Sequence, residues 1–384
     1  MSSREAFSNW LSENLNGEFE KIRWRGGPGD EDAFPELRQA WEAKLGEGGW
    51  IGAAWPKSFG GREADLMELV GLNEEYAIHG GPGRAGHIGE TLVAPTLIAY
   101  GTKWQQETFL EDIRLGRVFW CQGYSEPNAG SDLSNIKTKA VQLDGKWVIN
   151  GQKIWTSLAH EADWVFVVAR AVEGSKGRDG LVFLLVPLDQ PGVDIRPIRQ
   201  ISGSAEFNEV YFTDAITTEE CLVGEVGNGW DIAMALLGFE RGTSTLGQQM
   251  LFRNELDELI RRAKQNNAWE NPFIKKRIAK AHAGLKIMRF SAFRTLQGGE
   301  DGTLRPEALI SKIYWATWHR DLGDLAMDVL GYDADLIIDG ELDRLQKMYL
   351  FSRADTIYAG TNEIQKNIIS ERALSMPREP RGAK

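Results

Sequence analysis

The sequence predicts a multidomain α+β protein in which an N-terminal helical domain is followed by a middle β-domain and a C-terminal helical bundle. Two observations predict this order. Apolar residues recur at helical spacing in the first and last parts of the chain, whereas the middle part consists of short runs rich in β-branched and aromatic residues. A chain of 384 residues is also too long for one ordinary core, so two or three domains are expected.

The N-terminal domain is predicted over residues 1–116. Its segments carry apolar residues three and four positions apart, and Gly and Pro interrupt the pattern between them. The segments expected to be helical are 4–15, 34–45, 63–79, 92–101 and 103–116.

The middle β-domain is predicted over residues 117–226, where short apolar runs are separated by turn residues. Asp144 and Gly145 stand between two of these runs, and Asp-Gly is typical of a two-residue hairpin turn. The segments expected to be strands are 118–126, 137–143, 146–157, 163–172, 180–188 and 209–215.

The C-terminal domain is predicted over residues 227–376. Its segments are long and amphipathic, so we expect them to pack against one another as a bundle. The clearest of them are 254–265, 272–296, 306–330 and 341–357. The last residues, 377–384, are polar and are expected to form a flexible tail.

Charge and cysteine content exclude several functions. The formal net charge of −11 argues against nucleic acid or an anionic membrane as a partner. Cys121 and Cys221 form no CxxC pair, so neither a metal site nor a disulfide framework is indicated. No apolar run is long enough to span a membrane, and the first residues lack the apolar core of a signal peptide. We therefore expect a cytoplasmic protein.

Three stretches together resemble the acyl-CoA dehydrogenase family: "GYSEPNAGSDLSNIKTKA" (123–140), "INGQKIWTSLAHEADWVFVVAR" (149–170) and "IYAGTNEIQ" (357–365). The resemblance runs through nearly the whole chain and is weakest over the first 40 residues. It implies a middle antiparallel β-barrel or sandwich, a C-terminal four-helix bundle and non-covalently bound FAD. It also implies oxidation of an acyl-CoA to the trans-2-enoyl-CoA, as in fatty acid β-oxidation and related lipid metabolism. The acyl group itself stays open.

The cofactor-binding residues are assigned from this resemblance, and their chemistry suits a flavin. The loop "SEPNAGSD" exposes amides and hydroxyls, which stabilise negative charge on a reduced flavin ring. Ser131 is expected near both the FAD pyrophosphate and the substrate, and Ser157 near flavin N5, where the hydride arrives. The remaining cofactor contacts expected from the family are Gln122, Tyr124 (through its backbone), Ser125, Trp155, Gly331, Thr361 and Glu363.

The catalytic base is expected at Glu240. Many family members carry a catalytic glutamate directly before the Gly-Thr of the third stretch, but here that position is Ala359. Glu240 interrupts an apolar, helical segment, where a lone carboxylate needs a partner or a function. A minority of the family, including isovaleryl-CoA and long-chain acyl-CoA dehydrogenases, places its base on this helix before an arginine. The alternative is that Glu240 forms a structural ion pair with Arg241 or with another basic side chain.

The substrate contacts implied by the family pattern are Ser131, Phe239, Arg241, Gly360 and Arg372. The resemblance also implies an electron-transfer flavoprotein as electron acceptor and a homodimer or homotetramer. Two family boxes that reach the FAD of a neighbouring subunit are missing or altered, in "RRAKQNNAWENPFIKKR" (261–277) and "MDVLGYDAD" (327–335). Two alternatives remain: a flavin monooxygenase or desulfinase on the same scaffold, and a non-catalytic subunit of a mixed oligomer.

Overall fold

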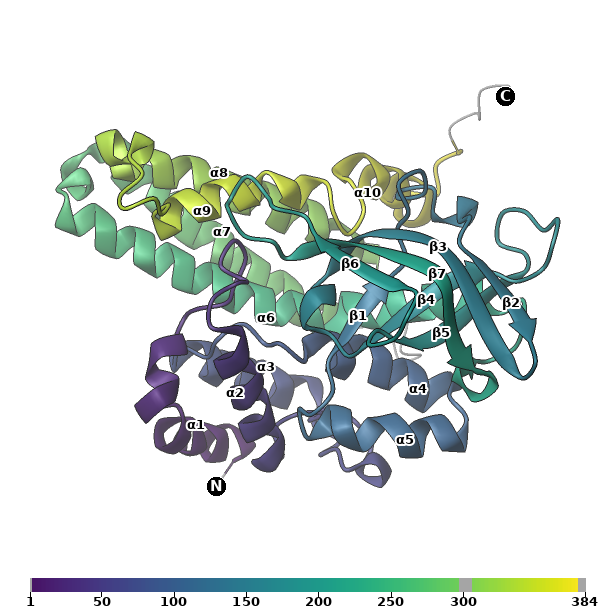
Figure 1. Ribbon diagram of the computed structural model, residues 1–384. Helices are drawn as coiled ribbons and strands as arrows, with labels where there is room; N and C mark the ends of the chain where they lie inside the picture. The colour runs from purple at the N-terminus through teal and green to yellow at the C-terminus, as the bar shows by residue number, and fades with distance from the viewer. Residues whose placement is uncertain (1, 297–305, 379–384) are drawn as a thin grey trace. The chain divides into compact units, whose positions relative to one another are not determined.

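The computed structural model describes residues 2–296 and 306–378, apart from the side chains of 239–248, 296, 306 and 307. It confirms the predicted order of a helical region, a β-domain and a helical domain (Figure 1). The chain divides into two compact units. The first contains Met1–Gly27, Glu31–Gln200 and Ser204–Ser244, and the second contains Pro28–Asp30, Ile201–Gly203 and Thr245–Lys384.

The N-terminal helices form where their spacing predicts them. Three of them begin at a capping box, in which Ser2, Asp65 or Thr102 accepts a hydrogen bond from a backbone N–H three residues later. The helices are α1 (Ser3–Asn14), α2 (Pro35–Glu47), α3 (Leu66–Ile78), α4 (Ala94–Tyr100) and α5 (Lys103–Arg114).

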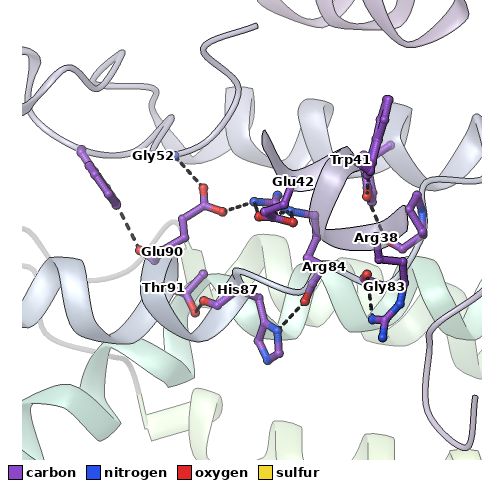
Figure 2. A network of polar contacts seen from close by, with 12 residues as sticks. Arg38, Trp41, Glu42, Gly52, Gly83, Arg84, His87, Glu90 and Thr91 are labelled. Carbon is purple, nitrogen blue, oxygen red and sulfur yellow. Dashed lines mark hydrogen bonds and ion pairs between the residues drawn. The ribbon is translucent and has the colours of Figure 1, made fainter. Parts of the chain in front are cut away.

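A buried ion network fixes the segment that leads into α4. Figure 2 shows the Arg84 guanidinium between the carboxylates of Glu42 and Glu90. Glu90 lies in a π-helical turn, Gly89–Val93, and its side chain also accepts the backbone N–H of Gly52 at 2.7 Å. Burial opposes the charge on Arg84, but the two carboxylates outweigh it and raise the pKa of the guanidinium. The turn is therefore held to α2 and to the loop before α3.

The middle domain is one eight-stranded sheet in the order β6-β7-β3-β2-β4-β5-β8, with β1 pairing to β4. Its pairings are antiparallel except for β1–β4 and a single residue pair between β2 and β4. The strands are β1 (Trp120–Gly123), β2 (Lys139–Leu143), β3 (Lys146–Ser157), β4 (Trp164–Arg170), β5 (Leu181–Pro187), β6 (Val193–Pro197), β7 (Phe207–Thr218) and β8 (Leu222–Val223). The sequence did not predict β6 and β8, because one is mostly polar and the other has only two residues.

The predicted hairpin joins β2 to β3. Asp144 and Gly145 both have positive φ, 49° and 74°, which matches the right-handed twist of the two strands. Leu143 and Lys146 are therefore paired directly across the turn.

Both faces of the sheet are covered within the first unit. On one face, β4 and β5 pack against α4, α5 and the start of the long helix α6 (Gly229–Gln265) (Figure 1). The buried residues of this layer include Leu97, Phe109, Ile113, Phe166, Phe183 and Leu236. A second apolar cluster, with Val165, Val167, Leu184, Val210 and Phe212, lies on the opposite face. This burial on both sides explains why β4 and β5 are continuous apolar runs.

The second unit is built from the helices that the amphipathic pattern predicts. Segment 254–265 is the end of α6, which runs for 37 residues. The other helices are α7 (Pro272–Leu296), α8 (Ser311–Leu330), α9 (Arg344–Ser352) and α10 (Asn362–Ile368). The buried faces of α6, α7, α8 and α9 share one core, which includes Phe252, Leu259, Ile278, Trp315, Leu322 and Met348. Among the described residues, no helix is long and apolar enough to cross a membrane. Of the predicted tail, residues 379–384 lie outside the described part.

Candidate functional site

The first predicted cofactor stretch, 123–140, forms the loop that follows β1. Gln122 is half-buried in β1, and Tyr124 is buried with its ring edge against Phe166 and Phe183. The Tyr124 hydroxyl donates to the backbone oxygen of Ala233 at 3.5 Å. The side chain of Tyr124 therefore packs in the core, and its predicted backbone contact with the cofactor stays a prediction.

A buried ion pair connects this loop to the sheet. Lys153, in β3, has an exposed fraction of 0%, and its ammonium donates to Glu126 at 2.8 Å. The same ammonium donates to the backbone oxygens of Tyr124 at 3.0 Å and of Val168 at 2.8 Å. Glu126 also accepts the backbone N–H groups of residues 137 and 138, at 2.7 and 2.9 Å. One ammonium thus joins the loop, β3 and β4.

The charges of this pair shift both pKa values. Burial lowers the pKa of Lys153 to about 8, against the opposing charge of Glu126. Burial pushes the pKa of Glu126 upward, but the charge and hydrogen bond of Lys153 outweigh it, so the net shift is downward. Glu126 therefore remains ionised at neutral pH. The sequence did not identify this pair, because its members lie 27 positions apart and match no motif.

The second predicted stretch is the end of β3, which is distorted. The register with β7 shifts between Lys153 and Thr156, and Trp155 has a left-handed backbone with φ of 60°. The Trp155 indole is 56% exposed although it lies in a strand. The backbone N–H of Ile154 donates to the backbone oxygen of Ser125 at 2.9 Å. The structure therefore brings the loop after β1 and the end of β3 together, as predicted.

These residues fit a flavin. A flat, exposed indole suits contact with an aromatic ring system, and the hydroxyls of Ser125 and Ser157 can bond its polar edge. Ser131 is exposed in the same loop, and no atom lies within 4 Å of a Cβ placed on the neighbouring Gly130. The loop is thus open to a bound group on this side.

Ser157 has a carboxyl neighbour that the sequence did not reveal. Its hydroxyl shares a hydrogen bond with the side chain of Glu206, and the next residue, Leu158, donates its backbone N–H to the backbone oxygen of Glu206 at 2.8 Å. Burial raises the pKa of Glu206 well above its ordinary value, and the nearby Glu31 raises it further. The folded protein therefore favours the protonated form of Glu206 more than the unfolded chain does. A lone glutamate in a loop gives no signal in the sequence.

The third stretch, in the second unit, forms a tight turn before α10. Ala359 and Gly360 both have positive φ, 50° and 85°. Thr361 is the N-cap of α10, and its hydroxyl accepts the backbone N–H of Ile364 at 3.2 Å. The Gln365 amide donates to the backbone oxygen of Ala359 at 3.1 Å, which closes the turn. Ala359 is exposed.

The other predicted site residues are distributed over both units. Glu363 lies in the first turn of α10, Gly331 ends α8 with φ of 59°, and Arg372 lies in the π-helical turn Ile369–Ala373. Phe239, Glu240 and Arg241 lie on α6, but their side chains are outside the described residues. Their predicted roles stay predictions.

Family models match all three parts of the chain. The acyl-CoA dehydrogenase N-terminal domain matches residues 3–117, the middle domain matches 121–215 and the C-terminal domain matches 227–374. These three ranges lie in the helical, β and helical regions that the structure shows.

Relatives match over nearly the full length. The acyl-CoA dehydrogenase IpdE1 of Mycobacterium tuberculosis is 50% identical over 386 residues, covering 99% of this chain and 98% of its own. The structure of the Tcur3481-Tcur3483 steroid ACAD is 26% identical with a TM-score of 0.86, covering 98% of this chain and 97% of that one. The ChsE4-ChsE5 complex from Mycobacterium tuberculosis is 28% identical with a TM-score of 0.83, with the same coverage.

The Lys153–Glu126 pair leads to a first prediction. Lys153→Met should lower the free energy of unfolding by roughly 3–5 kcal/mol, because it leaves the Glu126 carboxylate buried without its counter-charge. Lys139→Met, at an exposed position of the neighbouring strand β2, should change it by less than about 0.5 kcal/mol. Chemical denaturation followed by circular dichroism measures both. Equal, small losses in the two variants would show that the pair does not hold the loop.

Glu206 leads to a prediction about pH. A carboxyl whose pKa is raised in the folded state binds its proton more tightly there than in the unfolded chain. Its contribution to stability therefore falls as the pH rises above the ordinary glutamate pKa. Glu206→Gln, which keeps the shape of the protonated acid, should gain thermal stability relative to the wild type between pH 5 and pH 8. A melting-temperature difference that is constant over this range would contradict the assignment.

Proposed function

This chain belongs to the acyl-CoA dehydrogenase family, and we propose that it removes two hydrogens from the acyl group of a steroid-derived acyl-CoA to give the trans-2-enoyl-CoA. The dehydrogenase activity is supported by the identity of 50% to an acyl-CoA dehydrogenase over 99% of this chain. The steroid class is supported by the likeness to a steroid ACAD over 98% of the chain. A fatty-acid role is correspondingly less well supported.

FAD is the cofactor that these residues would hold, and when bound it supplies the hydride acceptor. Ser125, Trp155 and Ser157 form the described part of the ring site in the first unit. Thr361 and Glu363 are proposed cofactor contacts in the second. The hydrogen bond with Glu206 can fix the orientation of the Ser157 hydroxyl beside the proposed cofactor.

The proton chemistry is assigned to Glu240. In this proposal Glu240 takes the proton from the carbon next to the thioester carbonyl, as a general base. The backbone N–H of Ala359 donates to that carbonyl and stabilises the charge that develops there. A backbone donor is unaffected by the change of side chain at position 359, so the chain keeps this support while its carboxylate lies elsewhere. Phe239, Arg241, Gly360 and Arg372 are proposed to contact the substrate.

The natural form of the enzyme is proposed to contain two different chains. Both the Tcur3481-Tcur3483 and the ChsE4-ChsE5 structures bear the names of two chains, and each resembles this chain over its length. The missing and altered boxes at 261–277 and 327–335 also support this proposal, because a homo-oligomer of the usual kind would need them at the FAD of its neighbour. Electron-transfer flavoprotein remains the proposed acceptor, in the cytoplasm.

The cofactor proposal predicts a yellow protein from which denaturation releases intact FAD. Ser157→Ala should slow anaerobic flavin reduction by about 10- to 100-fold, the scale of one hydrogen bond to a charged group, while FAD retention changes less. Stopped-flow absorbance measures the reduction and fluorescence of released FAD measures the retention. Reduction should be fastest with a steroid side-chain acyl-CoA among straight, branched, aromatic and steroid substrates. A colourless protein that takes up no added FAD would refute the proposal.

The base assignment predicts that Glu240→Gln still binds FAD and acyl-CoA but loses at least ~10²-fold in flavin reduction. Glutamine keeps the shape of the side chain but cannot accept the proton. The double variant Glu240→Gly with Ala359→Glu should recover part of the rate, because it supplies the carboxylate at the family's commoner position. Reduction of Glu240→Gln at the wild-type rate would place the base elsewhere.

A further inference from the structure

A line of buried charged side chains crosses the core of the second unit. His319, in the middle of α8, is only 1% exposed. Its Nδ1 lies 2.5 Å from a carboxylate oxygen of Asp355, and its Nε2 lies 2.8 Å from a carboxylate oxygen of Glu255 on α6. The ring of Phe252 stacks on the imidazole with centroids 4.4 Å apart. Both ring nitrogens thus face a carboxylate.

The imidazole in this line is positively charged. Burial lowers the pKa of His319, but the carboxylates of Glu255 and Asp355 outweigh burial and raise it to about 10. Lys312 of α8 adds a second cation, because its ammonium donates to the backbone oxygen of Asp355. Burial lowers the pKa of Lys312, against the charges of Asp355 and Glu363. The imidazole thus contacts both carboxylates, and the Lys312 ammonium contacts the backbone of Asp355.

The line ends at the turn before α10. The second carboxylate oxygen of Asp355 accepts the hydroxyl of Tyr358 at 2.8 Å. Tyr358 directly precedes Ala359 and Gly360, the two residues with left-handed backbone. On the far side of the turn, Gln365 holds the backbone oxygen of Ala359. Hydrogen bonds therefore hold the turn on both sides. The one before the turn, from Tyr358 to Asp355, connects it to His319.

Stability alone does not account for this arrangement. Well-packed apolar residues can replace a buried ion network with little or no loss of stability, so buried charge is weak evidence for a stabilising role. The network instead fixes the orientation of the groups in it, since each hydrogen bond orients the next group. Direction matters at Ala359, because a residue with a Cβ adopts a left-handed backbone only where its surroundings hold it there.

We propose that the Glu255–His319–Asp355–Tyr358 chain positions the Ala359 N–H so that it points at the thioester carbonyl of the substrate. The proposal rests on the proposed function, in which that N–H supports the carbonyl. His319 touches neither substrate nor cofactor in this proposal and acts through Asp355 and Tyr358. It is thus a positioning residue. A substitution in the network, even one far from the turn, should therefore change the conformation of the turn.

The first test compares two tyrosines of the second unit in the FAD-loaded enzyme. Tyr358→Phe removes the hydroxyl that joins the network to the turn. Tyr314→Phe is the matched control, because its hydroxyl donates to the backbone oxygen of Gly284 at 3.4 Å, away from the turn. Loss of one buried hydrogen bond should speed amide hydrogen exchange in peptides covering 357–365 by about 5-fold in Tyr358→Phe only.

The second readout reports on the carbonyl itself. In Tyr358→Phe, the infrared carbonyl band of a bound enoyl-CoA should move to higher frequency, because a misdirected N–H polarises the carbonyl less. Flavin reduction should slow by a similar factor of about 5. A purely structural role would not move the carbonyl band, and Tyr314→Phe should leave it in place.

The third test acts at the far end of the network. Glu255→Gln removes one of the two carboxylates that keep His319 protonated, while Asp355, Lys312 and Tyr358 still face the network. Exchange in 357–365, corrected for its intrinsic pH dependence, should rise between pH 7 and pH 9 in this variant but not in the wild type. Glu258→Gln, on the same helix and paired with exposed Arg261, is the control.

These outcomes separate the inference from the proposed function. A wild-type enzyme that no acyl-CoA reduces would refute the proposed function, while the exchange measurements would still decide whether the network holds the turn. Two results would overturn the inference. One is an equal amide exchange rate of 357–365 in Tyr358→Phe and Tyr314→Phe, and the other is a pH-independent exchange rate of these residues in Glu255→Gln. Faster exchange with an unmoved carbonyl band would overturn the role toward the thioester.

Discussion

The candidate cofactor loop of the first unit depends on one buried ammonium. Lys153 reaches the loop after β1 through Tyr124 and Glu126, and it reaches β4 through the backbone oxygen of Val168. Without this contact the loop would have only a few backbone hydrogen bonds to hold it, because its own residues are mostly small or exposed. The ammonium is costly to bury, but one carboxylate oxygen and two backbone oxygens accept its hydrogen bonds, which offsets that cost and gives the loop a single position.

Both candidate sites also concentrate unusual backbone geometry. Trp155 lies at a β-bulge with positive φ, and Ala359 precedes a glycine with positive φ in a closed turn. Such conformations persist where the surrounding contacts determine them, and they occur most often at functional positions. Here each is adjacent to a buried charged contact: Lys153 two residues before Trp155, and the Asp355–Tyr358 bond directly before Ala359. In each case the buried charged contact therefore helps to hold the unusual backbone conformation next to it.

Much of the fold could be predicted from the sequence, but only part of the site. The N-terminal helices, the Asp144-Gly145 hairpin and the Thr361 cap depend on local spacing and turn chemistry, which one sequence displays. The full length of α6 and the existence of β6 and β8 depend on packing against distant segments. The side-chain partners of Lys153 and His319 lie 27 to 64 positions away, so no local pattern could reveal them. Glu206 could not be found for the same reason.

The two buried networks also explain why position 359 can vary. The groups that the proposed chemistry uses from these loops are backbone amides and small hydroxyls, which have few contacts of their own to hold them in place. Their positions must be fixed by neighbouring groups. A buried charged side chain can do this, because it is stable only when its hydrogen-bond partners are correctly oriented. A turn held by Asp355, Tyr358 and Gln365 keeps its shape whatever short side chain stands at position 359. Under the proposed function, the catalytic carboxylate can therefore lie on another element of the chain without any change in the backbone donor at position 359.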